Sequence, residues 1–157
     1  MITLYNTYRP SEQKIAHYPD LKDLIQEHVY VRKISKKETL LLQGSKCNSI
    51  YFVLNGLIKQ TSFVNKIKKV DKLFLEGSIA TDLNSLLDDT KSNVSFEAAA
   101  GTELWVLDSE NFHKLIAKDP EFKNQLVSSI KKLDESREKD FNYHLLMALY
   151  KNLENLS

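Results

Sequence analysis

The chain has 157 residues, 42% of them hydrophobic and 27% charged, which is the composition of an ordinary single-domain globular protein. Its 22 Lys and Arg residues and 21 Asp and Glu residues leave a net charge of +1, without the basic excess typical of nucleic-acid-binding chains. The single cysteine, Cys47, excludes a disulfide framework and a cysteine-based metal cluster within one chain. No apolar run approaches the roughly 20 residues of a membrane-spanning helix, so we expect a cytoplasmic protein with no membrane partner.

The first two thirds of the chain predict one helix followed by many short strands. Asp20 caps a helix expected over residues 18–28, with Leu21, Leu24 and Ile25 on one face. The β-rich segments that follow span residues 29–34, 39–43, 49–54, 57–64, 69–75, 93–98 and 103–107. The four glycines lie between or just after these segments. Many short strands separated by regular turns favour a mainly β fold, a jelly roll or a barrel, over a parallel sheet.

After residue 107 the pattern becomes helical. Ser109 is the expected cap of a short helix, and Asp119-Pro120 is expected to begin a long one, because no Gly or Pro follows before Ser157. We therefore divide the chain into a jelly-roll domain with its N-terminal helix, residues 1–118, and a long C-terminal helix, residues 119–157. The narrow apolar stripe of this helix consists of Phe122, Leu126, Ile130, Leu133, Phe141, Leu145 and Leu149.

That stripe predicts two kinds of packing. Its first part is expected to pack on the β domain, and its later part on a second copy of the chain. We assign dimerisation to Leu126, Ile130, Leu133, Phe141 and Leu145. The alternative is a helix folded wholly back on its own domain.

The ordered series of glycine-containing segments resembles a known family. LQG at 42–44 is followed by IYFVLNG at 50–56, a basic hairpin, LFLEG at 73–77, DLNSLL at 82–87 and ELWVL at 103–107. The series is similar to the cyclic-nucleotide-binding domain of the catabolite-activator (CRP/FNR) family of bacterial transcription regulators, over about residues 29–141. The resemblance implies a mainly β fold with flanking α-helices, namely an eight-stranded jelly roll, or double-stranded β-helix. It also implies that ligand binding in the jelly roll shifts the long helix and the geometry of a dimer.

The resemblance also implies where a ligand would bind, and there the sequence departs from the family pattern. In the family, a glutamate in a Gly-Glu-Leu run accepts a hydrogen bond from the ribose, and an arginine ten residues later pairs with the cyclic phosphate. The corresponding positions are Thr81-Asp82-Leu83 and Ser92, which Asn93 follows. Loss of the arginine is expected to cost about 2–5 kcal/mol of binding free energy. In the family these positions belong to the phosphate-binding cassette, and we use the word cassette for residues 81–93 of this chain. We expect this cassette to be degenerate and to hold no cofactor. Its ligand is either an unknown small-molecule effector or absent.

Arg137 interrupts the apolar stripe where the family's helix faces ligand and dimer partner. It either meets an anionic ligand, pairs across a dimer, or extends its charged end from the stripe into water. The family continues after the long helix into a helix-turn-helix domain. Only 16 residues follow Phe141, so residues 119–157 are expected to hold only the start of that domain, and this chain alone is not expected to bind DNA.

Other chemistry finds no support in the sequence. Cupin metal enzymes share the jelly roll but need two His and a Glu soon after the first glycine, whereas residues 45–55 read SKCNSIYFVLN. We assign no catalytic residue and no metal ligand, and we expect no enzyme. The predicted function is the sensor and dimerisation module of a CRP/FNR-type regulator. The alternative is a ligand-free interaction protein that dimerises with itself or with full-length regulators.

Overall fold

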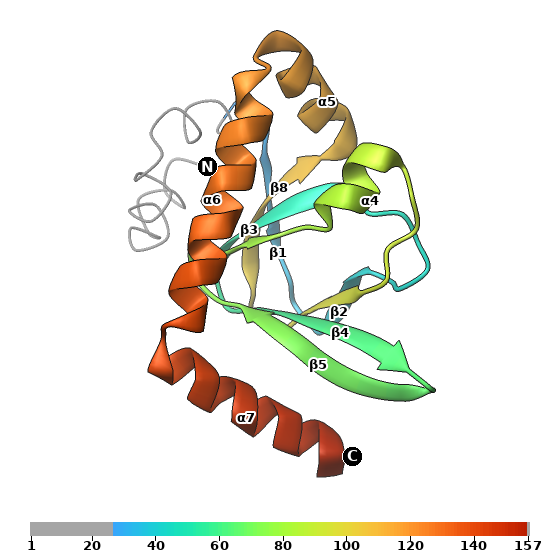
Figure 1. Ribbon diagram of the computed structural model, residues 1–157, viewed down its shortest axis with the longest axis vertical. Helices are drawn as coiled ribbons and strands as arrows, with labels where there is room; N and C mark the ends of the chain where they lie inside the picture. Colours follow the sequence, from blue (N-terminus) through green and yellow to red (C-terminus); the bar gives the residue numbers. More distant parts are fainter. Residues whose placement is uncertain (1–26, 157) are drawn as a thin grey trace.

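The computed structural model describes residues 27–156, and nearly all of the helix predicted over 18–28 lies outside them. The described chain forms eight strands, which confirms the predicted jelly roll (Figure 1). The strands are β1 (Tyr30–Lys33), β2 (Glu38–Leu41), β3 (Ser49–Asn55), β4 (Ile58–Val64), β5 (Ile67–Phe74), β6 (Ile79–Ala80), β7 (Ser95–Ala98) and β8 (Glu103–Asp108).

The strands form two antiparallel sheets, in the orders β1-β8-β3-β6 and β2-β7-β4-β5. The sequence did not predict β6, because its two residues are too few for a recognisable period-2 pattern. They pair with the middle of β3, where Ile79 lies opposite Phe52 and Ala80 lies opposite Tyr51. Through this pairing, the chain that follows β6 begins beside the central strand of the fold.

Strand β3 is buried on both of its faces. Tyr51 and Val53 point between the two sheets, whereas Ile50, Phe52 and Leu54 point to the opposite side, where the helices cover the sheet. This double burial explains why the segment reads as a continuous apolar run and does not alternate between apolar and polar residues. The layers are therefore sheet, sheet and helices, with one core on each side of β3.

Four helices complete the described chain: α4 (Leu83–Asp88), α5 (Ser109–Lys118), α6 (Glu121–Glu138) and α7 (Phe141–Leu156). The predicted cap of α5 is one residue too late, because the Asp108 carboxylate accepts the hydrogen bond from the Asn111 backbone N–H at 2.9 Å. Before α6, the Asp119 carboxylate accepts from the Glu121 backbone N–H at 3.1 Å. Phe122 and Leu126 of α6 are buried in the core beneath the helices.

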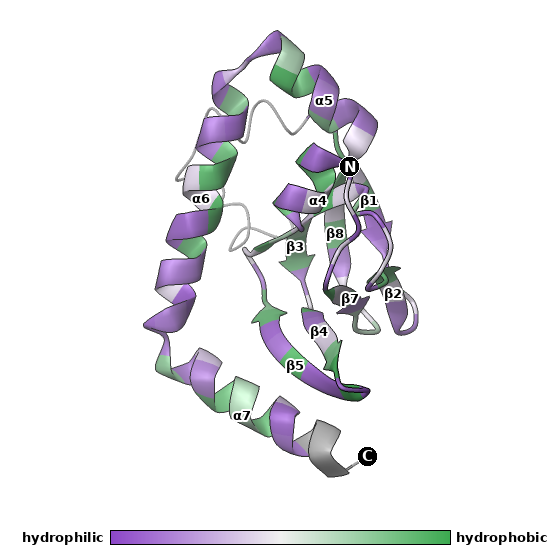
Figure 2. Cartoon of the chain, turned by 45° about the vertical axis from the view of Figure 1, so that its right-hand side comes forward, coloured by the Kyte–Doolittle hydropathy of each residue, from purple (hydrophilic) through white to green (hydrophobic). Residues whose placement is uncertain are grey.

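The expectation of one long helix after residue 119 is wrong, because the helix breaks at Lys139 and Asp140. The Asp140 carboxylate accepts hydrogen bonds from the backbone N–H groups of Asn142, at 2.9 Å, and Tyr143, at 3.3 Å. A new helix is thus capped where the first one ends, although no Gly or Pro is present. Helix α7 turns away from α6 and passes along β5 (Figures 1 and 2).

Helix α7 covers the outer face of β5. Tyr143 and Met147 form a third buried cluster with Val70 and Leu73, and the hydroxyl of Tyr143 accepts a hydrogen bond from the Leu73 backbone N–H at 3.1 Å. Helix α7 therefore folds back on its own domain, but it does so through a face that differs from the predicted apolar stripe.

The turn after β3 requires glycine. Gly56 has φ +90°, and a Cβ built on it would lie 2.6 Å from Oγ1 and 2.7 Å from Cα of Thr102. Thr102 cannot move away readily, because its hydroxyl lies 3.2 Å from the backbone nitrogen of Leu57 and 3.1 Å from the backbone oxygen. The family resemblance rests partly on Gly56, and this close approach to Thr102 is the physical reason why position 56 requires glycine.

We expect Gly56→Ala to lower the free energy of unfolding by more than Gly44→Ala. Gly44 also has a positive φ, +93°, but nothing lies within 4 Å of a Cβ added to it. Gly44→Ala is therefore expected to lower the free energy of unfolding only by the conformational cost, about 1–2 kcal/mol. Gly56→Ala adds overpacking against Thr102, a further cost of about 1–3 kcal/mol. Urea denaturation of the two variants measures the difference, and equal losses would contradict the close approach.

Candidate functional site

The segment between β6 and β7 contains the short helix α4, and hydrogen bonds hold both ends of this helix. Asp82 is the N-cap of α4, and its carboxylate accepts a hydrogen bond from the Ser85 backbone N–H at 3.2 Å. The buried hydroxyl of Ser85 donates to the backbone oxygen of Thr90 and accepts from the backbone N–H of Cys47 at 2.8 Å. Ser85 thus fixes both ends of the segment and ties it to the loop before β3. Sequence reasoning missed Ser85, because the loop that its hydroxyl contacts at Cys47 lies 38 residues away in the chain.

The positions of the family's glutamate and arginine are joined directly by a hydrogen bond. The hydroxyl of Ser92 donates to the second carboxylate oxygen of Asp82 at 2.7 Å, and Ser92 is only 2% exposed. The Ser92 backbone N–H donates to Ser45 at 2.7 Å, and its backbone oxygen accepts from Gly44 at 2.8 Å. Both carboxylate oxygens of Asp82 are therefore occupied by donors of the chain itself, and both are neutral donors.

The other predicted cassette residues lie around this pair in different ways. The Thr81 hydroxyl donates to the backbone oxygen of Ser49 at 3.1 Å. Leu83 packs against the core beneath the helices, and the side chain of Asn93 is exposed. The structure therefore brings Asp82 and Ser92 together, while Thr81 and Leu83 have structural contacts elsewhere and Asn93 faces solvent.

Aromatic side chains occupy the space between the sheets. Phe96 is fully buried, and its ring packs edge-on against that of Phe74 with 5.6 Å between the ring centroids. Tyr51 belongs to the same cluster, and its burial raises the pKa of its hydroxyl to about 12. At this pKa the hydroxyl is neutral at physiological pH and supplies no charge to the interior.

Arg137 lies at the end of α6, apart from the cassette pair. Its side chain is 8% exposed, so the expectation that its charged end reaches water is wrong. The guanidinium pairs with Asp134 and lies over the rings of Phe74, at 5.1 Å, and Tyr143, at 5.7 Å. Arg137 therefore links the interior aromatic cluster to the junction of α6 and α7, and the residues that it contacts are Asp134, Phe74 and Tyr143.

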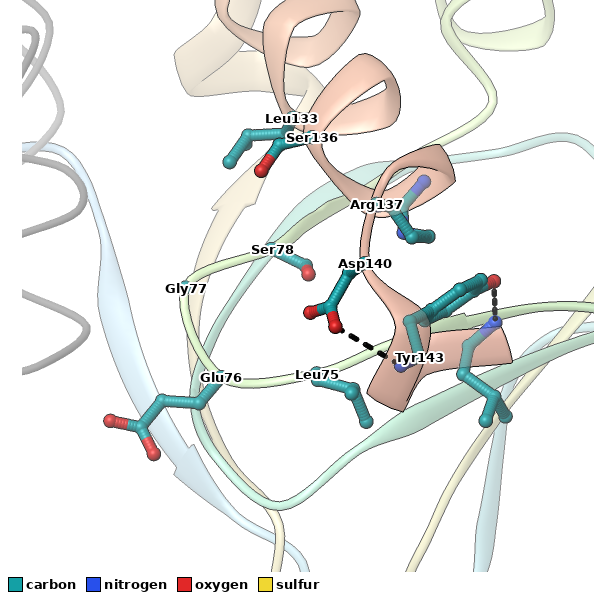
Figure 3. Close-up of a pocket in the computed structure, with 10 residues that line it drawn as sticks. Leu75, Glu76, Gly77, Ser78, Leu133, Ser136, Arg137, Asp140 and Tyr143 are labelled. Carbon is teal, nitrogen blue, oxygen red and sulfur yellow. Dashed lines mark hydrogen bonds between the residues drawn. The ribbon is translucent and has the colours of Figure 1, made fainter. Parts of the chain in front are cut away.

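The junction of α6 and α7 borders a small cavity of about 80 Å³. Figure 3 shows Asp140 and Tyr143 on one side of it and the turn at Gly77 on the other. Burial raises the pKa of the Tyr143 hydroxyl, which keeps this group neutral. Sequence reasoning missed Tyr143, because its role depends on the helix break that brings it against β5.

The predicted dimerisation residues occupy two different surfaces. Leu126 is fully buried in its own domain, and Ile130 and Leu133 are partly buried against the same core. Phe141 is 77% exposed, and Leu145 is also exposed, on the face of α7 turned away from β5. The single stripe expected from the sequence is thus divided by the helix break.

The described residues 27–156 offer neither a metal-ligand cluster nor a membrane-spanning helix. Within this range no group of three or more His, Cys, Asp or Glu side chains is placed to hold a metal ion. In the same range no helix combines the length and apolar character that crossing a bilayer requires.

Comparisons with known proteins agree with this geometry. Residues 31–119 match the protein family described as "Cyclic nucleotide-binding domain". The chain belongs to this family. No curated protein matches it significantly. The cyclic nucleotide-binding domain described here includes both β6 and the cassette helix α4.

Solved structures show the same fold at low sequence identity. The catabolite activator protein of Thermus thermophilus is 24% identical, with a TM-score of 0.63, over 82% of this chain and 59% of that one. A putative cyclic nucleotide binding protein of Ruegeria pomeroyi is 24% identical, with a TM-score of 0.58, over 86% and 54%. The N-terminal domain of a transcriptional regulator of Streptomyces coelicolor is 14% identical, with a TM-score of 0.58, over 78% and 85%. The chain spans just over half the length of the first two structures. The expected resemblance is confirmed at the level of the cyclic nucleotide-binding domain and its fold.

We expect Asp82→Ala to lower the free energy of unfolding by about 1–3 kcal/mol, because it removes the cap of α4 and the nearer acceptor of the buried Ser92 hydroxyl, which keeps only the Val94 backbone oxygen at 3.1 Å. Asn84→Ala, two residues further along with an exposed side chain, is the matched control and should change stability by less than about 0.5 kcal/mol. Thermal or urea denaturation measures both. Similar values for the two variants would show that the Asp82 bonds do not hold the cassette.

Proposed function

We propose that this cyclic nucleotide-binding domain is a regulatory module of a CRP-type transcription regulator, and that its cassette does not hold cyclic AMP with ordinary affinity. The observation that carries the proposal is the 2.7 Å hydrogen bond between Ser92 and Asp82. A cyclic phosphate needs a cation or several N–H donors when it leaves water. At the position of the arginine, Ser92 offers one hydroxyl, which already donates to a carboxylate.

The packing between the sheets supports the same conclusion. A nucleotide held inside the jelly roll would have to share this space with the rings of Phe74 and Phe96. Displacing a buried aromatic ring from a close-packed core costs several kcal/mol in the absence of a compensating contact. These buried rings favour the alternative function, a ligand-free interaction module, over a sensor of a small molecule at the cassette.

The proposed module has no catalytic role and no cofactor. The buried hydroxyls of Ser85 and Ser92 and the thiol of Cys47 are held in structural hydrogen bonds. These groups stabilise the cassette and do not form the nucleophile–base pair that covalent catalysis needs.

Wild-type protein is expected to bind cyclic AMP with a Kd weaker than micromolar, because the missing arginine corresponds to about 30-fold to several-thousand-fold in affinity. Isothermal titration calorimetry with cyclic AMP measures this. A micromolar or tighter Kd would contradict the proposal.

Two variants distinguish specific binding of cyclic AMP at the cassette from nonspecific attraction of the nucleotide by positive charge. Ser92→Arg restores the cation beside Asp82 and should strengthen cyclic AMP binding by about tenfold or more. Asn93→Arg adds the same charge at the neighbouring exposed position and should leave the affinity nearly unchanged. Equal gains in both variants would mean that nonspecific charge attracts the nucleotide.

We also propose that the chain forms a homodimer, with the exposed face of α7 in the contact. Phe141, Leu145 and Leu149 recur at four-residue steps on this face, and all three are exposed. An amphipathic helix normally buries its apolar face, and α7 has a second apolar face already packed on β5.

At tens of micromolar, sedimentation equilibrium is expected to give the mass of a dimer. Leu145→Asp should shift the equilibrium to monomer, because it places a charge in the centre of the apolar face. Lys151→Asp changes an exposed residue of the same helix and should leave the dimer intact. A wild-type monomer at this concentration, or equal effects of the two variants, would exclude a contact through this face.

A further inference from the structure

A second cavity lies away from the cassette, on the outer side of the sheet β2-β7-β4-β5. It has a volume of about 260 Å³. Its apolar lining consists of Leu57 and the alanines at 98–100, which together we call the apolar floor, and of Tyr150 of α7. Lys37, Lys59 and Glu97 also line it. The cavity is therefore apolar inside and charged at one side, which is the usual build of a small-molecule pocket.

The charged side is centred on one carboxylate. The Glu97 side chain is 11% exposed, and its oxygens lie 2.8 Å from the ammonium of Lys68, 3.6 Å from that of Lys37 and 3.8 Å from that of Lys59. Burial by itself raises the pKa of Glu97, but the hydrogen bond and charge of Lys68 and the charges of Lys59 and Lys37 outweigh this and lower it. Glu97 is thus ionised at neutral pH and fixed in place by Lys68.

The ammonium groups of Lys37, Lys59 and Lys68 all lie within 4 Å of the Glu97 carboxylate. Lys68 makes the closest contact with Glu97, whereas Lys37 lies further away and its side chain is 67% exposed. The charge of Lys37 is therefore available at the rim, beside an apolar floor. A ligand that matches both features carries one negative group and a compact apolar body.

We propose that this cavity binds a small aromatic carboxylate, with its ring against Leu57 and Tyr150 and its carboxylate at Lys37. The volume of the cavity limits the size of its ligand. Ordinary ligand pockets have volumes of about 300 to 1,000 Å³, and this cavity lies just below that range. One or two rings fit such a space. The site does not depend on the cassette or on dimerisation, and the bound ring joins α7 to the sheet.

The test uses 2-naphthoate as the probe and its neutral carboxamide, 2-naphthamide, as the matched control. Titration of the full chain is followed by backbone amide NMR. We expect shifts that saturate at millimolar naphthoate or below and that are concentrated at Leu57, residues 98–100 and Tyr150. The carboxamide is expected to bind about two- to fivefold more weakly, because it lacks the ion pair with Lys37.

Two lysine variants complete the test. Lys37→Gln should weaken naphthoate binding by about two- to fivefold and leave carboxamide binding unchanged. Lys33→Gln, an exposed lysine on β1 in the other sheet, should change neither. The proposal is overturned if naphthoate produces no saturable shifts, if the shifts lie elsewhere on the protein, or if Lys37→Gln and Lys33→Gln behave alike.

Discussion

The burial of both faces of β3 is the constraint on which the rest of the structure depends. Each large apolar side chain on this strand gains about 1.5–3 kcal/mol from burial, so neither face can be left to water. The second sheet covers Tyr51 and Val53, and the helices cover Ile50 and Phe52. Helix α6 is held against the jelly roll for the same reason, and its end is thereby placed beside the interior aromatic cluster.

The cassette shows how one changed position alters the chemistry of its neighbour. Without a cation at position 92, the carboxylate of Asp82 has an N–H group at the start of α4 and the hydroxyl of Ser92 as its donors. These neutral donors leave its negative charge in place. An anionic ligand in this cassette would meet that charge and would have to break the Ser92 bond, so the arrangement that stabilises the cassette also opposes a cyclic phosphate.

The sequence predicted the jelly roll because glycine turns and β-rich segments are local signals, whereas other features depend on packing. The family resemblance implied that positions 82 and 92 belong to one cassette, but their direct hydrogen bond could be seen only once the chain was folded. The helix break was missed because the segment contains no Gly or Pro. It arises from the cap at Asp140 and from burial of Tyr143 against β5, which exists only in the tertiary structure. Arg137 was misjudged for the same reason, since two rings from different elements enclose it.

Helix α7 carries two apolar faces, and one domain can cover only one of them. Its Tyr143 and Met147 face is buried on β5, where it also shields the strand's outer side chains from water. A straight continuation of α6 would carry α7 away from β5 and expose this cluster, so the break stabilises the monomer. The break leaves the apolar side chains of Phe141 and Leu145 exposed to solvent. Only another surface that covers them would remove them from water. The same bend that completes the domain therefore leaves exposed the apolar face that the proposed homodimer would cover.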